Sequence, residues 1–136
     1  MEQEAPRVVI ADDDDDVRNG ISLALKLSGY KVWKTKSSQE CLAEVKKLDG
    51  KINIVVINGT IAADANVKLI FNLKRINPGI KVLVIADNHD SPNKMTMMDF
   101  GADEFALKPQ TLDSITNKVT MLLIDTATAI HNTPSR

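Results

Sequence analysis

A short apolar stretch that ends in five consecutive aspartates is the feature that most constrains the fold of this chain. Residues 8–11 are apolar and largely β-branched, and the run is too short for a helix, so it predicts a fully buried strand. Ligands of open parallel sheets bind beyond the carboxyl ends of the strands. The strand therefore places Asp12 and Asp13 where carboxylates serve metal or phosphate chemistry, and Asp14 or Asp15 is the predicted N-cap of the following helix. Taken alone, the same run is equally typical of a solvated acidic loop.

Length and composition restrict the class of protein. The chain has 136 residues, of which 43% are hydrophobic and 26% charged, which is enough for one compact domain with a core. A net charge of −1 lacks the excess of positive charge that nucleic-acid binding uses, so binding of nucleic acid is not expected. No apolar run is long enough to span a membrane. Residues 1–6 lack the pattern of a signal peptide, so we expect a cytoplasmic protein. The single cysteine, Cys41, is expected to be a small buried apolar residue, neither a disulfide partner nor a metal ligand.

Short strand patterns alternate with helical patterns along the rest of the chain. The predicted strands cover residues 8–11, 31–34, 52–57, 80–85 and 104–107. Beyond the first helix, the predicted N-caps are Ser37, Asp64, Ser91 before Pro92, and Thr111. Short connections between strands and helices predict parallel pairing, right-handed crossovers and helices on both faces, which is a three-layer α/β sandwich.

Two further expectations concern the last two helices. In the helix that begins at Ser91, the spacing predicts that Met95 and Met98 face inward and that Met97 lies off this apolar stripe. Met97 and Asn93 are then candidate exposed contacts for a partner. The last helix is expected to run through Leu112, Ile115, Val119 and Leu122 and to end beyond residue 124, and residues 131–136 form a polar tail that we expect to be frayed.

Five positions that could belong to a site fall at the predicted carboxyl ends of the strands. Asp12 and Asp13 follow the first strand, Asn58 the third, Ala86 the fourth and Lys108 the fifth. Because the carboxyl ends of parallel strands share one edge of the sheet, these positions are expected to converge on one pocket.

Residues 7 to about 124 resemble the response-regulator receiver domain, the module that accepts a phosphoryl group from a histidine kinase onto an aspartate. The resemblance rests on the strand and acids at 8–14 with Val17-Arg18 behind them, on residues 29–32, on residues 101–105 and on Lys108-Pro109. It implies a CheY-like, flavodoxin-like (βα)5 fold with strand order 2-1-3-4-5. Residues 1–6 would be an N-terminal extension and residues 125–136 the end of the last helix with the tail.

The resemblance assigns roles to four residues. Asp12 and Asp13 match the acidic pair that holds Mg²⁺, a cation that prefers carboxylate oxygens and several waters. Lys108 matches the lysine that pairs with the phosphoryl group or the acceptor carboxylate. Phe105 matches the aromatic switch position.

Two positions depart from the family pattern. Asn58 stands where the family has its phosphoacceptor aspartate, and a neutral amide is not a nucleophile of the same kind as a carboxylate. Ala86 stands where the family has a Ser or Thr, and its methyl group forms no hydrogen bond. Asp64 does not replace the acceptor, because it lies six residues further on, at a predicted helix start.

These departures predict a stand-alone receiver-like protein that is not an enzyme and works without phosphorylation, through protein contacts at residues 91–123. The expected partner is a histidine kinase or a downstream signalling protein, and the chain itself is expected to be a monomer or weak homodimer. With one carboxylate fewer in the pocket, we expect Mg²⁺ binding to be weak or absent. The candidate ligands are Asp12, Asp13, the Asn58 oxygen and the Thr60 carbonyl. Lys108 is expected to bridge Asp12, Asp13 and the side-chain oxygen of Asn58.

Other functions stay open at this point. A conventional, Mg²⁺-dependent phosphorylatable receiver is the first alternative, and it requires a different register at Asn58. A small Asp-dependent phosphatase is weaker, since it rests only on the Asp-x-Asp within 12–14. An EF-hand is excluded, because the sixth loop position is Val17 instead of glycine and the twelfth is Leu23 instead of glutamate.

Overall fold

The computed structural model describes residues 4–87 and 93–132, with residues 125–132 as backbone alone. Its centre is a five-stranded parallel sheet with strand order β2-β1-β3-β4-β5. The strands are β1 (Arg7–Ala11), β2 (Lys31–Thr35), β3 (Ile54–Asn58), β4 (Lys81–Ala86) and β5 (Glu104–Leu107). This arrangement confirms the predicted parallel sheet and strand order, with strand bounds displaced by one or two residues.

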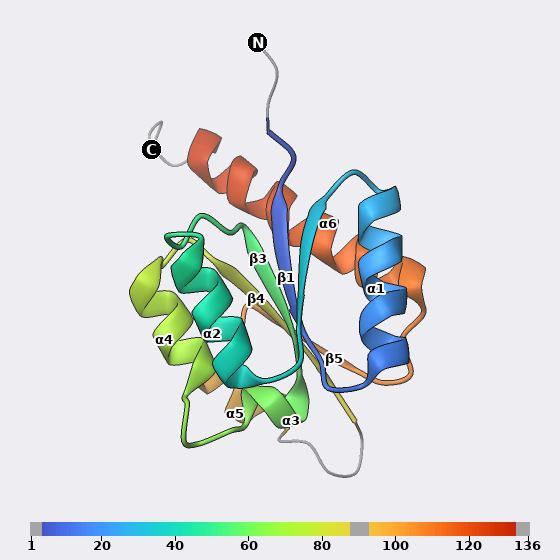
Figure 1. Ribbon diagram of the computed structural model, residues 1–136. Helices are drawn as coiled ribbons and strands as arrows, with labels where there is room; N and C mark the ends of the chain where they lie inside the picture. The colour runs from blue at the N-terminus through green and yellow to red at the C-terminus, as the bar shows by residue number, and fades with distance from the viewer. Residues whose placement is uncertain (1–3, 88–92, 133–136) are drawn as a thin grey trace.

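Helices cover both faces of the sheet (Figure 1). They are α1 (Asp15–Leu27), α2 (Ser38–Lys47), α3 (Gly59–Ala62), α4 (Leu69–Ile76), α5 (Lys94–Asp99) and α6 (Leu112–Asn132). Helices α1 and α6 pack on one face, while α2, α3, α4 and α5 pack on the other. The three-layer sandwich is therefore confirmed, with α3 as a short helix that periodicity did not predict.

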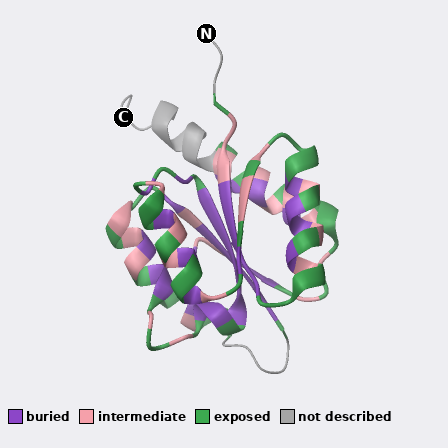
Figure 2. Ribbon diagram, viewed as in Figure 1, coloured by how far each residue is buried: buried purple, intermediate pink, exposed green. Residues whose placement is uncertain are grey.

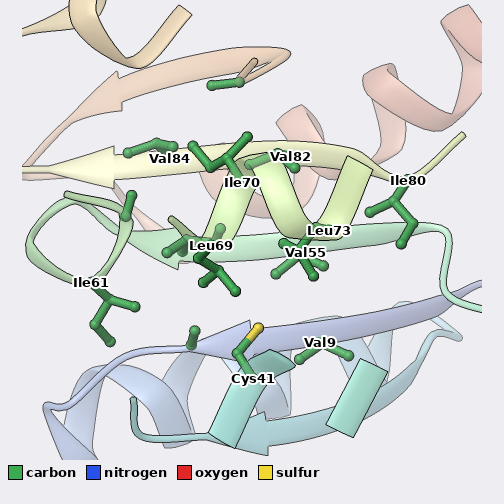
Figure 3. Close-up of a cluster of buried hydrophobic side chains, with 14 of the residues drawn as sticks. Val9, Cys41, Val55, Ile61, Leu69, Ile70, Leu73, Ile80, Val82 and Val84 are labelled. Carbon is green, nitrogen blue, oxygen red and sulfur yellow. The ribbon is translucent and has the colours of Figure 1, made fainter. Parts of the chain in front are cut away.

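The alternation of side chains along each strand divides the core into two layers. Val8 and Ile10 of β1 face α1 and α6, whereas Val9 and Ala11 face the other layer. Figure 3 shows this second layer, where Cys41 of α2 lies near Val9 and where α4 covers β3 and β4. Strands β1, β3 and β4 are buried along almost their whole length, as Figure 2 shows, and this explains their continuous apolar sequences. The edge strand β2 is mostly exposed or half-buried.

Most of the predicted helix starts are confirmed. Asp14, not Asp15, is the N-cap of α1, and its carboxylate accepts from the N–H groups of Asp16 and Val17. Ser37 caps α2 and Thr111 caps α6 by the same type of bond. These caps satisfy N–H groups that have no partner within the helix.

The prediction that Asp64 caps a helix is wrong. The chain first forms the short helix α3, and α4 begins only at Leu69, after Lys68 in a left-handed conformation with φ 51°. The Asp64 carboxylate instead accepts from the Asn66 N–H at 3.0 Å and from the Ser38 hydroxyl at 2.9 Å. Asp64 therefore ties the loop before α4 to the start of α2.

The predicted inward face of α5 is also wrong. Met97 is completely buried in the core, while 74% of Met95 is exposed and Met98 is partly exposed. The helix has only six residues, and its methionines at 95, 97 and 98 lie on different sides of it. The spacing of apolar residues therefore does not identify the buried side. Asn93 is exposed as expected and is the N-cap, whereas Ser91 and Pro92 lie outside the described residues.

The last helix extends two residues into the segment predicted to be a tail. The backbone of α6 continues to Asn132, so His131 is helical and does not belong to a frayed tail. Residues 133–136 lie outside the described residues. The predicted boundary between helix and tail is therefore too early.

Candidate functional site

The carboxyl edge of the sheet brings together side chains from three strands that are distant in sequence. Asp12 follows β1, and its N–H donates to the Thr35 carbonyl at 3.1 Å. Asn58 is the last residue of β3, and Lys108 follows β5, with its N–H bonded to the Ala86 carbonyl at 2.8 Å. Asp12, Asn58 and Lys108 all line one cavity of about 240 Å³.

The Asn58 amide lies between the two acids of the first strand. Its Nδ2 is 3.3 Å from Oδ1 of Asp13 and 3.5 Å from Oδ1 of Asp12, and only 8% of Asn58 is exposed. Its Oδ1 accepts from the Thr60 N–H at 3.4 Å, so the amide nitrogen faces the carboxylates and the oxygen faces α3. Asn58 also serves as the N-cap of α3.

Lys108 does not form the bridge that the sequence predicted. Within residues 4–87 and 93–132, no nitrogen–oxygen pair within 4.0 Å joins the Lys108 ammonium to Asp12 or Asp13. Lys108 is half-buried and acts on Asp12 through space, as an attractive charge. The bridge between the two carboxylates is instead the neutral Asn58 amide.

Asp12 is the most buried acid of the site, with 4% of the residue exposed. Burial raises the pKa of its carboxyl group above the ordinary value of 3.8, because water no longer solvates the anion. The Asp14 N–H, 2.9 Å from Oδ1, and the charge of Lys108 act in the opposite direction. Asp13, by contrast, is exposed at the edge of the site.

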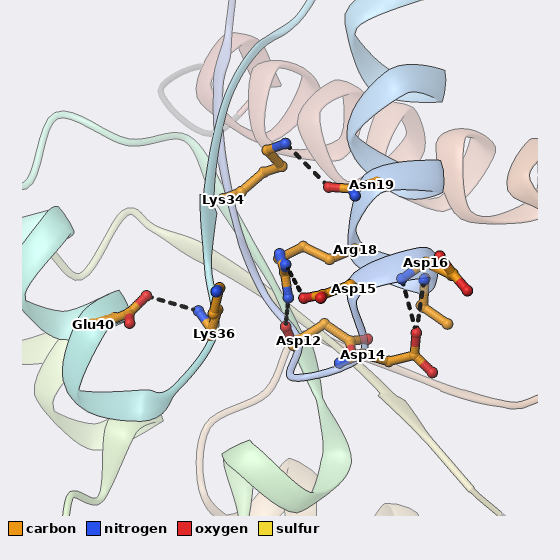
Figure 4. A network of polar contacts seen from close by, with 10 residues as sticks. Asp12, Asp14, Asp15, Asp16, Arg18, Asn19, Lys34, Lys36 and Glu40 are labelled. Carbon is orange, nitrogen blue, oxygen red and sulfur yellow. Dashed lines mark hydrogen bonds and ion pairs between the residues drawn. The ribbon is translucent and has the colours of Figure 1, made fainter.

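Arg18 of α1 holds the acidic loop through hydrogen bonds, a role that the sequence analysis missed. It is 6% exposed, and its Nη1 donates to the Asp12 carbonyl at 2.8 Å (Figure 4). Its Nη2 pairs with the Asp15 carboxylate, which lowers the pKa of Asp15. The available signal was an arginine on the inner face of α1, three residues after an acid.

The oxygen atoms that Asp12, Asp13 and Asn58 offer at this site only partly fit the coordination of Mg²⁺. Carboxylate oxygens of Asp12 and Asp13 suit this cation, but the Asn58 oxygen is turned toward Thr60. Thr60 lies within α3 and donates its N–H to Asn58. Among the described residues, no cluster of three or more His, Cys, Asp or Glu side chains has a metal-binding arrangement.

The two positions expected to belong to a switch are both buried. Ala86 ends β4 and is fully buried, with a methyl group where the family pattern has a side-chain hydroxyl. Phe105 lies in β5 with 9% of the residue exposed. The aromatic ring is thus held inside the protein while the residue at the end of β4 donates no side-chain hydrogen bond to the pocket.

The curated proteins that this chain resembles include regulatory proteins and a phosphodiesterase. The chain is 25% identical over 116 residues to a cyclic di-GMP phosphodiesterase of Thermotoga maritima, covering 85% of this chain and 30% of that protein. It is 27% identical over 118 residues to response regulator RR06 of Streptococcus pneumoniae, covering 85% of this chain and 52% of that protein. The chain therefore spans about a third to a half of the length of these relatives.

Solved structures share the fold at low sequence identity. A response regulator receiver domain from Clostridium thermocellum matches with a TM-score of 0.78 at 21% identity, over 88% of this chain and 95% of that chain. A CheY-like receiver domain from Methanospirillum hungatei matches with a TM-score of 0.77 at 21% identity, over 91% and 98%.

The family model described as the response regulator receiver domain matches residues 8–120, which include the five strands except Arg7, and also the acidic edge of the sheet. Together with the strand order and the position of Asp12, Asp13 and Lys108, this match identifies the chain as a member of the response regulator receiver domain family.

Proposed function

We propose that this receiver domain works in two-component signalling without aspartyl phosphorylation, by contact with other proteins. The observation that supports this most directly is the identity of the residue at the end of β3. Asn58 lies there, within hydrogen-bond distance of both acids of the first strand. A carboxylate attacks phosphorus because it is anionic, whereas the amide is neutral and its electrons are delocalised.

A second observation supports the same proposal. Ala86, at the end of β4, offers no hydroxyl to hold a phosphoryl group. The nearest acid after Asn58 in sequence, Asp64, is bonded to Ser38 and Asn66 and lies at the loop before α4. The described part of β3 and its following loop thus provides no replacement for the acceptor.

We propose that Mg²⁺ binding is weak or absent, and the same geometry supports this. The Asn58 N–H groups already satisfy oxygens that a cation would otherwise bind, and one charge fewer reduces the repulsion that a cation relieves. We expect titration calorimetry with millimolar MgCl₂ to give no saturable binding to the wild type. The Asn58→Asp variant is the matched control, and we expect it to bind. Saturable binding to the wild type would contradict this part of the proposal.

The proposed partner surface is residues 91–123, which would contact a histidine kinase or a downstream signalling protein. Its described part carries exposed large apolar side chains, which are Met95, Met98, Phe100, Leu107, Leu112 and Met121. We propose that the domain is a cytoplasmic monomer or weak homodimer with no enzymatic activity and no contact with nucleic acid. None of the helices in the described residues is long and apolar enough to cross a membrane.

Phosphoryl transfer from a small donor tests the proposal. The wild type and the Asn58→Asp variant are incubated with acetyl phosphate and Mg²⁺, and intact mass is measured. We expect labelling of the variant alone, which would mean that the rest of the pocket is competent. Labelling of the wild type to the same extent would instead support the alternative, a conventional receiver with another acceptor.

The weaker phosphatase alternative is tested with the same proteins. Asp12 and Asp14 are the first and third residues of its Asp-x-Asp, but Asp14 is occupied as the N-cap of α1. We therefore expect no hydrolysis of a generic aryl phosphate by the wild type. Turnover that is lost in Asp12→Asn would favour the enzyme.

A further inference from the structure

Two exposed phenylalanines line a second cavity, on the face of the sheet opposite to α1 and α6. The chain has three phenylalanines. Phe105 is buried, whereas Phe71 on α4 is 58% exposed and Phe100, directly after α5, is 50% exposed. Both line a cavity of about 330 Å³ between the loop after α3, α4 and the end of α5 (Figure 1). Phenylalanine is among the residues most often buried, so two half-exposed rings at one hollow indicate a contact surface.

Part of the apolar surface at this cavity is open to solvent. Leu69 and Ile70 are packed in the core and contribute only its base. Ala63 and Ala65 are exposed residues, and they line the cavity together with the two phenylalanine rings. A partner that covers these four residues would therefore remove apolar surface from water.

The ring of Phe71 is held in place by its own helix. Cζ of the Arg75 guanidinium, one turn further along α4, lies 5.8 Å from the centroid of this ring, which is a cation–π contact. The contact orders the ring in the free protein. Binding through Phe71 would therefore cost less conformational entropy than binding through an unrestrained side chain.

Two side chains of opposite charge line the same cavity. Lys68 directly precedes α4 and Asp99 ends α5, and both residues are exposed. In the part of the chain that the structure describes, neither side chain forms a hydrogen bond or an ion pair. The third charged residue of the cavity, Asp64, already accepts from Ser38 and Asn66. The cavity therefore offers a partner one cation and one anion.

We propose that this surface is a dimer contact, at which two copies of the chain meet about a two-fold axis. In such an interface the same surface of both copies is used, so Lys68 would face Asp99 of the second copy and Asp99 would face its Lys68. A partner surface of one sign would satisfy one of these charges and leave the other facing a like charge. A second copy satisfies both and also covers the phenylalanines of both chains.

The surface is small, so the dimer is expected to be weak and reversible. The inference goes beyond the proposed function, which allows a monomer or a weak homodimer and assigns no dimer surface. It involves neither phosphoryl transfer nor Mg²⁺.

Sedimentation velocity of the full chain in EDTA, without any phosphoryl donor, tests this inference. We expect the apparent mass to rise from the 14.9 kDa of one chain toward twice this value between about 10 μM and 1 mM protein. A chain that is still monomeric at about 1 mM would overturn the inference.

Two alanine variants test whether the phenylalanines form the contact. Phe71→Ala should weaken dimerisation at least about tenfold. Met95 is more exposed than Phe71 but does not line the cavity, so Met95→Ala is the matched control and should dimerise like the wild type. A dimer that is lost in Met95→Ala and retained in Phe71→Ala would place the contact elsewhere on α5 and overturn the inference.

Charge reversal identifies the residues that face each other across the axis. Lys68→Asp or Asp99→Lys alone would place like charges opposite each other at both contacts, so each should weaken the dimer at least about tenfold at low ionic strength. An equimolar mixture of the two variants should restore the dimer, because the mixed pair has a carboxylate opposite an ammonium at both contacts. The rescue also shows that both variants are folded.

The matched control for charge reversal is Lys26→Asp. Lys26 is exposed on α1, which packs on the opposite face of the sheet, so this variant should dimerise like the wild type. Equal loss in Lys26→Asp, or absence of rescue in the mixture, would contradict the inference. These results do not depend on whether acetyl phosphate labels the wild type or Asn58→Asp.

Discussion

The side-chain amide of Asn58 donates to Oδ1 of Asp13 at 3.3 Å, across the edge of the sheet from β3 to the loop after β1. The same nitrogen lies 3.5 Å from Asp12. A neutral donor thus lies where an aspartate would add a third negative charge to the pair. The acidic pocket of this receiver domain is therefore held together by hydrogen bonds between its own residues.

Replacement of Asn58 by aspartate should destabilise the fold in the absence of Mg²⁺. Asn58→Asp removes the donor to both acids and adds a like charge, and we expect a loss of about 1–3 kcal/mol in the free energy of unfolding. Urea unfolding at low ionic strength in EDTA measures it. Millimolar Mg²⁺ should restore stability to the variant, because a ligand that binds only the folded state stabilises it.

The matched control for this substitution is Asn117→Asp. Asn117 is exposed on α6, so the same change there should alter stability by no more than about 0.5 kcal/mol. A variant Asn58→Asp that is as stable in EDTA as the wild type would show that the amide bridge contributes nothing.

Asp12 should make the protein less stable as the pH rises. Burial raises the pKa of Asp12 in the folded state above its ordinary value of 3.8, so the folded state binds this proton more tightly than the unfolded state. The free energy of unfolding then decreases as the pH rises from 3.8 through the raised pKa. Asp12→Asn should flatten this dependence and stabilise the protein at neutral pH.

Urea unfolding of both proteins across this pH range, in EDTA, measures the effect. The asparagine oxygen can still accept from the Asp14 N–H, so the loop geometry is preserved. Identical pH profiles for wild type and Asp12→Asn would contradict the assignment of the raised pKa to Asp12.

The two methionines of α5 should differ sharply in their effect on stability. Met97 is fully buried, so Met97→Ala should cost about 2–5 kcal/mol through lost contacts and a cavity. Met95 is largely exposed, and Met95→Ala should change stability by less than about 0.5 kcal/mol. Chemical denaturation compares the pair, and similar losses would contradict the described orientation of α5. A charged residue at 97 would disrupt the core, so Met95→Arg is the suitable probe of the partner surface.

The single thiol should be inert in the folded protein. Cys41 is fully buried in the layer under α2, and burial raises its pKa to about 12. Because the thiolate is the reactive form, we expect no modification by a disulfide reagent at about pH 8 in native buffer. Complete reaction in concentrated urea is the control. If Cys41 reacted as fast in native buffer as in urea, the packing of α2 over this residue would have to open readily.

Local sequence patterns were sufficient for much of the architecture. Most strands of this chain are short apolar runs bounded by turns, and the caps Asp14, Ser37 and Thr111 act within three residues of their own position. Such features depend on neighbours in sequence, so they can be predicted without a structure. The convergence of Asp12, Asn58 and Lys108 followed in the same way from parallel strand order, although their contacts did not.

The sequence patterns by themselves therefore determined the parallel sheet, most helix starts and which residues lie at the acidic edge, and the resemblance to receiver domains implied the strand order. Only the tertiary structure decided that Asn58 rather than Lys108 links the acids, that Arg18 supports their loop, and that Met97 faces the core. A difference of about one ångström decides whether two groups form a hydrogen bond. That distance depends on how strands far apart in sequence pack together, and periodicity along the chain carries no information about it.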